Sequence, residues 1–299
     1  MPNNSTATTP ASTPAAESQR NAALPGAALV GENFLAAPID SASAHPRNFV
    51  GRVMSVWYRH VRVYSRTLIS NALPPFLEPL IFLVGIGMGL GQFVGTMDGQ
   101  PYIQYLAAGL LITAAMFTAT FECSFGTYIR LEFDKVYDGM LGAPITANNL
   151  LLGEIVWAAT KGFVFTLAVL IVAMTAGILS PGWILFAPVI GFFTGAMFAT
   201  LGLLMNAFVK NINQFNFLFS GLISPMFFFA GVVFPIENLP RAAQPIAIIL
   251  PLTHPVRLTR ALAGAGWSPE LWWSILYIAV VTAAMGTAAL KLLNKKLVD

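Results

Sequence analysis

Six long apolar stretches lie between residues 76 and 292 of the 299-residue sequence. Each approaches the ~20 residues that a helix needs to cross the hydrocarbon of a bilayer. Only 10% of the residues are charged, compared with roughly 25% in a soluble globular protein, so the chain has too little charge to cover a surface that faces water. We therefore expect an all-α polytopic membrane protein. The six predicted spanning helices lie near residues 76–95, 102–125, 151–176, 184–208, 215–234 and 271–292.

The first 70 residues follow two other patterns. Residues 1–46 are rich in Ala, Ser, Thr, Pro and Asn without hydrophobic periodicity, which predicts a disordered tail and no cleaved signal sequence. Between residues 48 and 70, apolar and aromatic residues recur every three or four positions, and Arg52, Arg59 and Arg66 recur every seven. This pattern predicts an amphipathic helix that lies along the inner headgroup region of the membrane. A soluble helix packed on a partner would show the same pattern.

The positions of Lys and Arg predict the orientation, because cytoplasmic loops of membrane proteins carry the excess of positive charge. With six spans, the two ends of the chain lie on one side, together with the loops that follow spans 2 and 4. Three basic residues fall on the other side: Arg241, Arg257 and Arg260. Eleven fall on the side of the two ends: Arg47, Arg52, Arg59, Arg62, Arg66, Arg130, Lys135, Lys210, Lys291, Lys295 and Lys296. Both termini and the stretch 131–146 are therefore predicted to be cytoplasmic.

The segment between spans 5 and 6, residues 235–270, is unusual for an outer loop. Its stretch FPIENLPRAAQPIAIILPLTHPVRLTRAL contains five prolines and one apolar run, 246–250, which is too short to cross a bilayer. Two half-helices that enter the membrane and return would account for this pattern, provided that protein buries the broken backbone. We expect such a re-entrant segment, with an ordinary structured outer loop as the alternative.

Four ionisable residues lie in or beside the predicted spans: Glu78, Glu122, Glu154 and Lys161. Charges at membrane depth are costly and usually paired. Lys161 follows Glu154 by seven residues, so the two lie on about the same helix face. One interpretation is an inner vestibule in which Glu122, Glu154 and Lys161 receive the polar headgroup of a substrate. The alternative is a set of structural ion pairs among the first three spans.

Two regular stripes mark the first two spans. An aromatic stripe at steps of four, four and three lies on span 2 and would either line a lipid path or pack against neighbours; it consists of Phe117, Phe121, Phe125 and Tyr128. Glycines at GxxxG spacing lie on span 1 and predict close helix packing rather than a nucleotide loop. They are Gly85, Gly87, Gly89 and Gly91.

The motifs of several enzyme classes are missing from the sequence. The P-loop pattern GxxxxGK[ST] does not occur, and one cysteine with three widely separated histidines leaves no metal-ligand spacing, so we expect no cofactor, metal or nucleic-acid partner. An intramembrane prenyltransferase would hold Mg²⁺ with two acidic motifs; Asp134 and Asp138 form DxxxD, but the loop 209–214 has no carboxylate. A proton-coupled carrier would use Glu122 or Glu154, although such carriers usually have more spans and internal repeats.

The combination of a basic amphipathic helix, six spans, a charged stretch after span 2 and a proline-broken outer segment resembles an ABC-2-type transporter permease. Several stretches are similar to the NodJ family, the permeases of nodulation-type lipo-oligosaccharide exporters. They are EPLIFLVGIGMGLG (78–91), YLAAGLL (105–111), ATFE (119–122), GEIVWAATK (153–161), FFAGVVFPIENLP (228–240) and LPLTHPVRL (250–258). The resemblance covers roughly residues 48–295 and implies one ABC-2 transmembrane domain over residues 47–299.

This resemblance implies that the chain is a subunit of a bacterial inner-membrane exporter and has no ATPase activity of its own. Two copies, surrounded by membrane lipids, would pair with two copies of a separate NodI-type cytoplasmic ATPase that binds Mg-ATP. The assembly would move a lipo-oligosaccharide or a similar glycolipid or polysaccharide outward. The stretch 131–146 would be the coupling helix that docks on this ATPase. Its contact residues would be Glu132, Asp134, Lys135, Tyr137 and Asp138.

Overall fold

The computed structural model describes residues 48–66, 68–266 and 268–298, and the predicted tail 1–46 lies outside them. Residues Asn48–Asp299 form one compact unit. Its first half contains α2 (Phe49–Ser65), α3 (Leu68–Phe82), α4 (Gly89–Val94), β1 (Thr96–Met97), β2 (Gln100–Pro101), α5 (Tyr102–Phe121), α6 (Val136–Leu141) and α7 (Ala147–Thr175). Its second half contains α8 (Ala187–Phe208), α9 (Phe215–Leu218), α10 (Ser224–Phe229), α11 (Gln244–Ile249), α12 (Thr253–Arg260) and α13 (Leu271–Val298).

Five helices among the described residues are long and apolar enough to cross a membrane, and they correspond to five of the predicted spans. They are Phe76–Val94, Tyr102–Phe133, Ala147–Thr175, Trp183–Phe208 and Leu271–Leu297. The predicted span 215–234 is helical only from Phe215 to Phe229, through α9, a π-helical turn and α10. At ~1.5 Å per residue this helix is about 22 Å long, which is shorter than the ~30 Å hydrocarbon core. The six-span count therefore stays a prediction.

A short hairpin joins α4 to α5, so the described residues are not purely helical. Thr96 pairs with Pro101 and Met97 with Gln100 across β1 and β2. The turn between them is Asp98–Gly99, and both residues have positive φ, 52° and 74°. Asp-Gly is a preferred pair for such a two-residue turn, because both central positions need φ above zero.

Glycines hold α7 and α8 together at the centre of the bundle. A Cβ on Gly162 would lie 2.7 Å from the Gly191 carbonyl oxygen, and one on Gly191 would lie 2.2 Å from Thr166 Oγ1. Small residues allow such close backbone approach between helices in a membrane. The glycines predicted to pack on span 1 are less closely packed. Gly87 lies against α5, while a Cβ added at Gly85 or Gly89 would meet no neighbouring segment within 4 Å. The main glycine contact therefore lies between spans 3 and 4.

The amphipathic helix predicted before span 1 is α2, and it has three faces rather than two. Val53, Val56 and His60 are buried, and a Cβ on Gly153 of α7 would lie 2.5 Å from Val56 Cβ. Because helical residues rotate by about 100° each, the Arg residues fall on a second face. A third face, which includes exposed Val50 and other apolar residues, is free to contact lipid. The helix therefore packs on its own bundle and still presents basic and apolar faces.

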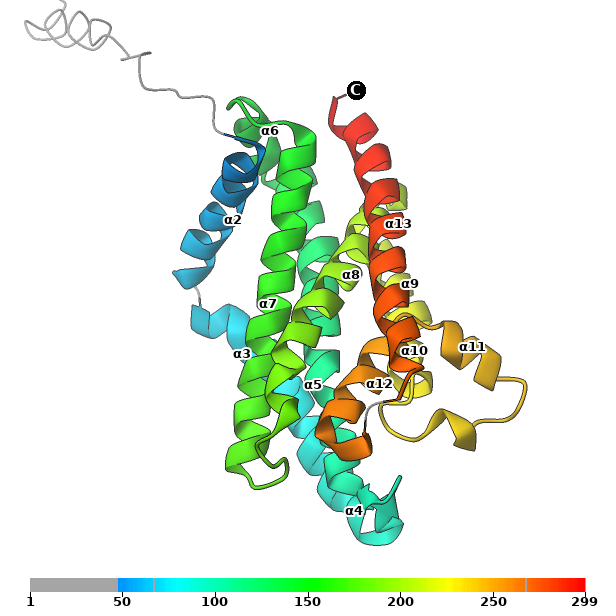
Figure 1. The fold of residues 1–299 in the computed structure, drawn as a ribbon. Helices are drawn as coiled ribbons and strands as arrows, with labels where there is room; N and C mark the ends of the chain where they lie inside the picture. Colours follow the sequence, from blue (N-terminus) through cyan, green and yellow to red (C-terminus); the bar gives the residue numbers. More distant parts are fainter. Residues whose placement is uncertain (1–47, 67, 267, 299) are drawn as a thin grey trace, which may run out of the picture. The chain divides into compact units, whose positions relative to one another are not determined.

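The proline-broken segment forms two short helices with different surroundings. In α12, Thr253, His254, Val256 and Leu258 are buried, and α12 lies against α5, α8 and α13. In contrast, α11 projects to one side of the bundle (Figure 1), and its Ile249 side chain is 68% exposed. A helical pair was expected here, and its insertion into the membrane stays a prediction.

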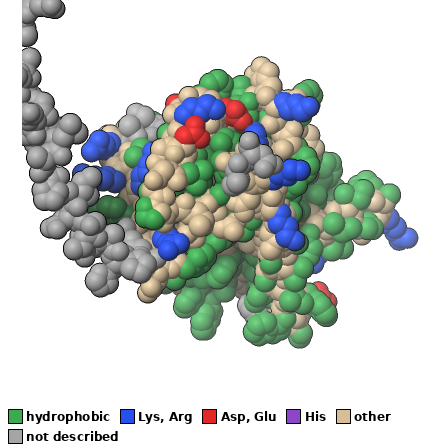
Figure 2. Space-filling model, turned by 90° about the horizontal axis from the view of Figure 1, so that it is seen from above, with side chains coloured by type: hydrophobic (Ala, Val, Ile, Leu, Met, Phe, Trp, Pro, Cys, Tyr) green, Lys and Arg blue, Asp and Glu red, His purple; other side chains and the backbone are tan. Residues whose placement is uncertain are grey.

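Several segments far apart in the sequence meet at one end of the bundle. Figure 1 shows α6, the beginning of α2 and the end of α13 at the same end. Figure 2 shows this end in space-filling form. Lys and Arg side chains are spread over it, and the Asp and Glu side chains gather beside one of the basic groups. This arrangement agrees with the predicted grouping of basic residues on one side of the membrane.

Candidate functional site

A buried network of charges lies where α5 continues toward α6. Arg130 Nη1 is 2.8 Å from Glu122 Oε1, and Arg130 Nη2 is 2.7 Å from Glu154 Oε2. Lys161 Nζ is 2.8 Å from the other Glu122 oxygen. Two carboxylates thus face two cations, so the cluster is formally neutral. This balance allows the group to stay charged with little access to water.

The helices that carry these charges explain how they meet. Glu122 begins a π-helical turn after α5, and Arg130 lies in a second such turn at Ile129–Phe133. The two turns change the rotation of the helix, so that Arg130 reaches back to donate to the Glu122 carbonyl oxygen as well, at 3.3 Å. Glu154 and Lys161 come from α7 at nearly the same azimuth, two turns apart. The network therefore joins the end of span 2 that is nearer to α6 to span 3.

Aromatic side chains from α2 and α7 cover the Lys161 end of the network. Lys161 Nζ lies 4.6 Å from the centre of the Tyr64 ring and 6.0 Å from that of Trp157. The His60 and Trp157 rings are stacked, with centroids 5.8 Å apart. Cation–π contact stabilises an ammonium group away from water. Helix α2 is thus part of the site, and not only a membrane anchor.

Glu154 is the residue through which α6 and α2 enter the network. Its side chain is fully buried, and Oε1 accepts a hydrogen bond from Tyr137 Oη at 2.7 Å. The same oxygen lies 2.9 Å from His60 Nε2. Burial, reinforced by the Glu154 carboxylate, raises the pKa of Tyr137 well above its usual value, so the phenol keeps its proton and acts as the donor. Tyr137 thereby fixes α6 to the inside of the bundle.

The structure brings together the three predicted headgroup residues, Glu122, Glu154 and Lys161, and pairs them with groups of the same chain. The sequence analysis missed Arg130 and His60 as members of this cluster. Their partners are eight and 94 residues away, and one sequence offers no signal for the longer separation. The pairing corresponds to the structural alternative stated for these charges, while a role in substrate binding stays a prediction.

Three potential metal ligands also meet here. One ligand atom from each of His60, Glu122 and Glu154 lies within 4.8 Å of the others. However, Arg130 and Lys161 already bind the carboxylate oxygens. A divalent cation in the same place would face two positive groups at short range. The residues therefore fit a protein ion-pair network better than a metal site.

The predicted coupling residues divide into an exposed set and a buried one. Asp134, Lys135 and Asp138 are exposed, whereas Tyr137 is only 1% exposed. Tyr137 therefore anchors α6 inward, and its side chain is not available as a contact surface. Glu132 is about one-third exposed and pairs with Lys296 of α13 at 2.8 Å. The segment is attached at two points and presents a small charged surface between them.

The match to known proteins covers this site. A family model described as ABC-2 type transporter matches residues 52–263. Nodulation protein J of Sinorhizobium fredii (strain NBRC 101917 / NGR234) is 37% identical over 218 residues, which are 73% of this chain and 81% of that protein. The chain belongs to the NodJ family of ABC-2 permeases. Nodulation protein J of Rhizobium meliloti (strain 1021) is 36% identical over 210 residues, 70% of this permease and 80% of the relative.

A more distant relative is also named a permease. The inner membrane transport permease YadH of Escherichia coli (strain K12) is 20% identical over 201 residues, 67% of this chain and 78% of that protein. Family membership and the five long apolar helices make the protein a multi-pass membrane permease. It is a transport component and not itself a catalytic enzyme.

The aromatic stripe of the permease packs against the short helix that follows α8. Phe121 stacks on Phe219 with centroids 4.1 Å apart, and the Phe125 centroid lies 5.0 Å from that of Phe215. Further along the stripe, Phe117 contacts the α10 ring of Phe227, and Tyr128 donates a hydrogen bond to the Lys210 carbonyl. These contacts account for the stripe as packing between span 2 and residues 215–229. A substrate path along it stays a prediction.

Proposed function

We propose that the permease is the membrane subunit of an ATP-driven exporter that moves a lipo-oligosaccharide or a similar glycolipid or polysaccharide outward across the bacterial inner membrane. The substrate class is the one implied by the resemblance to the NodJ family, to which the relatives named nodulation protein J belong, and the membrane is supported by the relative named inner membrane transport permease. The sequence carries no P-loop. A separate NodI-type cytoplasmic subunit would therefore bind and hydrolyse Mg-ATP, and two copies of each chain would form the transporter.

The observation that carries this proposal is the attachment of α6. Asp138 of α6 and the two residues just before this helix, Asp134 and Lys135, are exposed, while Tyr137 holds the Glu154 carboxylate inside the bundle. A partner that pulls on α6 would therefore move Glu154 and the paired charges with it. Such a link suits a rigid-body transition driven from outside the permease. It also accounts for the charged residues that lie in and just before one short helix between two long apolar ones.

The same geometry weighs against a proton-coupled carrier. A carrier would need a carboxylate that gains and loses a proton during transport. Both buried carboxylates, Glu122 and Glu154, are held by Arg130, and Glu122 also by Lys161. With Tyr137 and His60 on the second Glu154 oxygen, all four carboxylate oxygens are already engaged within the chain. The pairs therefore fit a fixed structural unit that moves as a whole.

The proposal is tested by reversing the exposed acidic charges of the α6 segment. We expect Asp134→Lys with Asp138→Lys to abolish co-purification of the P-loop ATPase with a tagged permease, because the docking charges change sign. Membrane insertion and expression should not change, since both side chains are exposed. The matched control is Glu237→Lys, an exposed carboxylate in the proline-broken segment. A stoichiometric ATPase retained by the double variant would contradict the docking assignment.

A further inference from the structure

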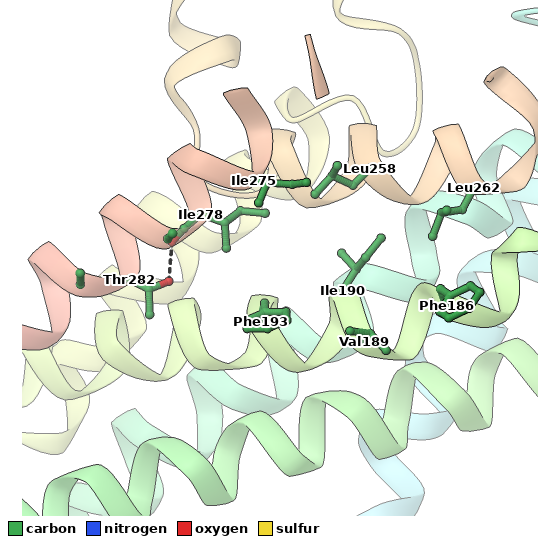
Figure 3. Close-up of a pocket in the computed structure, with 11 residues that line it drawn as sticks. Phe186, Val189, Ile190, Phe193, Leu258, Leu262, Ile275, Ile278 and Thr282 are labelled. Atoms are coloured by element: carbon green, nitrogen blue, oxygen red, sulfur yellow. Dashed lines mark hydrogen bonds between the residues drawn. The ribbon is translucent and has the colours of Figure 1, made fainter. Parts of the chain in front are cut away.

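An apolar groove of about 590 Å³ lies between α8, α12 and α13, away from the charge network. Figure 3 shows Ile190 and Phe193 on α8 below the groove, with Leu258 of α12 and Ile275 of α13 above it. Phe193 is 53% exposed and Ile275 40%, so the groove opens to the surroundings of the bundle. It is a hollow on the outside of the helices, and not a closed cavity within them.

The lining of the groove offers almost nothing for a polar ligand. Thr282 carries the one hydroxyl among the lining side chains that the structure describes. Its Oγ1 donates to the Ile278 carbonyl at 2.6 Å, the contact drawn in Figure 3. The donor is therefore already used within α13. An occupant that matches this lining is a hydrocarbon chain, because a polar one would leave its hydrogen bonds unmade.

Tryptophans place the groove at the depth of lipid acyl chains. Trp183 stands just before α8 and is 74% exposed, and Trp273 at the beginning of α13 is 71% exposed. Exposed tryptophans at the ends of apolar helices mark the boundary between headgroups and hydrocarbon. The groove begins two to three residues further along each helix, at Phe186 and Ile275, and runs to Ala283. At ~1.5 Å per residue, it covers about 12 Å of the outer hydrocarbon layer.

A polar pocket of about 300 Å³ adjoins the groove at its headgroup end. Charged side chains of both signs line it: the carboxylates of Asp98, Glu237 and Glu270 and the guanidinium groups of Arg257 and Arg260. A third hollow lies beside both, because Ala261 lines it together with the polar pocket and Leu262 lines it together with the groove. From the polar pocket to the groove, the lining thus changes from mixed charge to almost entirely apolar. This order matches a lipid that carries a phosphate and an ammonium group at its head.

We propose that the groove binds an acyl chain of a zwitterionic phospholipid from the surrounding bilayer. The chain lies between α8 and α13, and the headgroup lies in the polar pocket, its phosphate toward Arg257 and its ammonium toward Glu237 and Glu270. The lipid fills the space between α12 and the two spans. This site is separate from the α6 surface, so the test of lipid binding does not depend on the exporter proposal.

The test uses the full-length permease in bilayers of phosphatidylethanolamine and phosphatidylglycerol, with a photoreactive phosphatidylethanolamine whose diazirine is on the acyl chain. After illumination, we expect the label on the α8 and α13 residues that line the groove, and competition by unlabelled phosphatidylethanolamine in preference to phosphatidylglycerol. Ala279→Phe places a ring in the groove and should reduce this labelling about tenfold, the factor for losing roughly two buried methylene groups. Glu237→Gln with Glu270→Gln should remove the preference between the two headgroups, because phosphatidylglycerol has the phosphate but lacks the ammonium group.

Ala284→Phe is the matched control for the groove variant. Ala279 and Ala284 are both exposed on α13, but only Ala279 lines the groove, so the control should label like the wild-type permease. Even labelling of all lipid-facing helices, or unchanged labelling in the Ala279→Phe variant, would overturn the proposal. So would a crosslink in the groove to a second copy of the permease, since that copy would then be the occupant.

Discussion

Replacing Arg130 by Met tests whether the buried charges form one unit. Met keeps most of the side-chain volume and removes the cation that bridges Glu122 and Glu154 at 2.8 and 2.7 Å. The network then holds two carboxylates and one cation, and Glu154 itself is fully buried. Breaking a buried pair by removing one partner costs about 3–5 kcal/mol. We expect the free energy of unfolding, measured by denaturant titration in mixed micelles, to fall by about that amount.

The second half of this experiment restores neutrality. Glu154→Gln alone removes a carboxylate that Arg130, Tyr137 and His60 all contact, so we expect it to be destabilising as well. The double variant has one carboxylate and one cation, Glu122 and Lys161, still 2.8 Å apart. Its loss should therefore be smaller than the sum of the two single losses by at least ~1 kcal/mol, within the range seen for residues in one network. Additive losses would refute the idea of a single charge-balanced unit.

Two further predictions follow from individual contacts. Gly191→Ala should lower the thermal midpoint of the permease, because the new Cβ would lie 2.2 Å from Thr166 Oγ1; such overpacking costs about 1–3 kcal/mol. Gly221→Ala is the control, since a Cβ at that position meets open space. Equal midpoints for the two variants would exclude the close α7–α8 contact. Tyr137→Phe removes the donor to Glu154 and should leave ATPase association intact while reducing the ATP turnover coupled to transport in reconstituted vesicles. Full coupling in this variant would show that the hydroxyl does not transmit the motion.

The long spans could be predicted from the sequence because their signal is local. A run of apolar residues with the right length predicts its own helix, and five such runs became helices of suitable length. The run at 215–234 shows the limit of this reasoning. Its composition is mostly apolar, but Gly231 adopts a φ of +82° and Pro235 follows, so the helix ends at Phe229. A hydropathy pattern gives only a weak signal of where the backbone leaves the helical conformation, whereas the structure shows it directly.

The membership of the charge network could be predicted only in part. Glu122, Glu154 and Lys161 stand out because charges are rare in apolar spans. Arg130 looked like one of many basic residues of an inner loop, since the helical turns that aim it at Glu122 are π-helical and change the usual spacing of faces. His60 belongs to a helix whose basic residues pointed to the membrane surface. Its contact with Glu154 depends on the packing of α2 on α7, which no local pattern encodes.

The two attachments of the α6 segment suggest how a displacement there would reach the opposite side of the membrane. Tyr137 connects it to α7, which continues for 29 residues or about 43 Å without a break. Glu132 connects it to Lys296 near the end of α13, a helix of 28 residues. At its other end α13 lines the apolar groove. A rigid rod transmits an end displacement along its length, so α6 and the groove are coupled if α13 moves as one body. Charge reversal of both partners, Glu132→Lys with Lys296→Glu, should then preserve transport that either single change weakens, and transport that is equally weak in all three variants would remove Lys296 from this route.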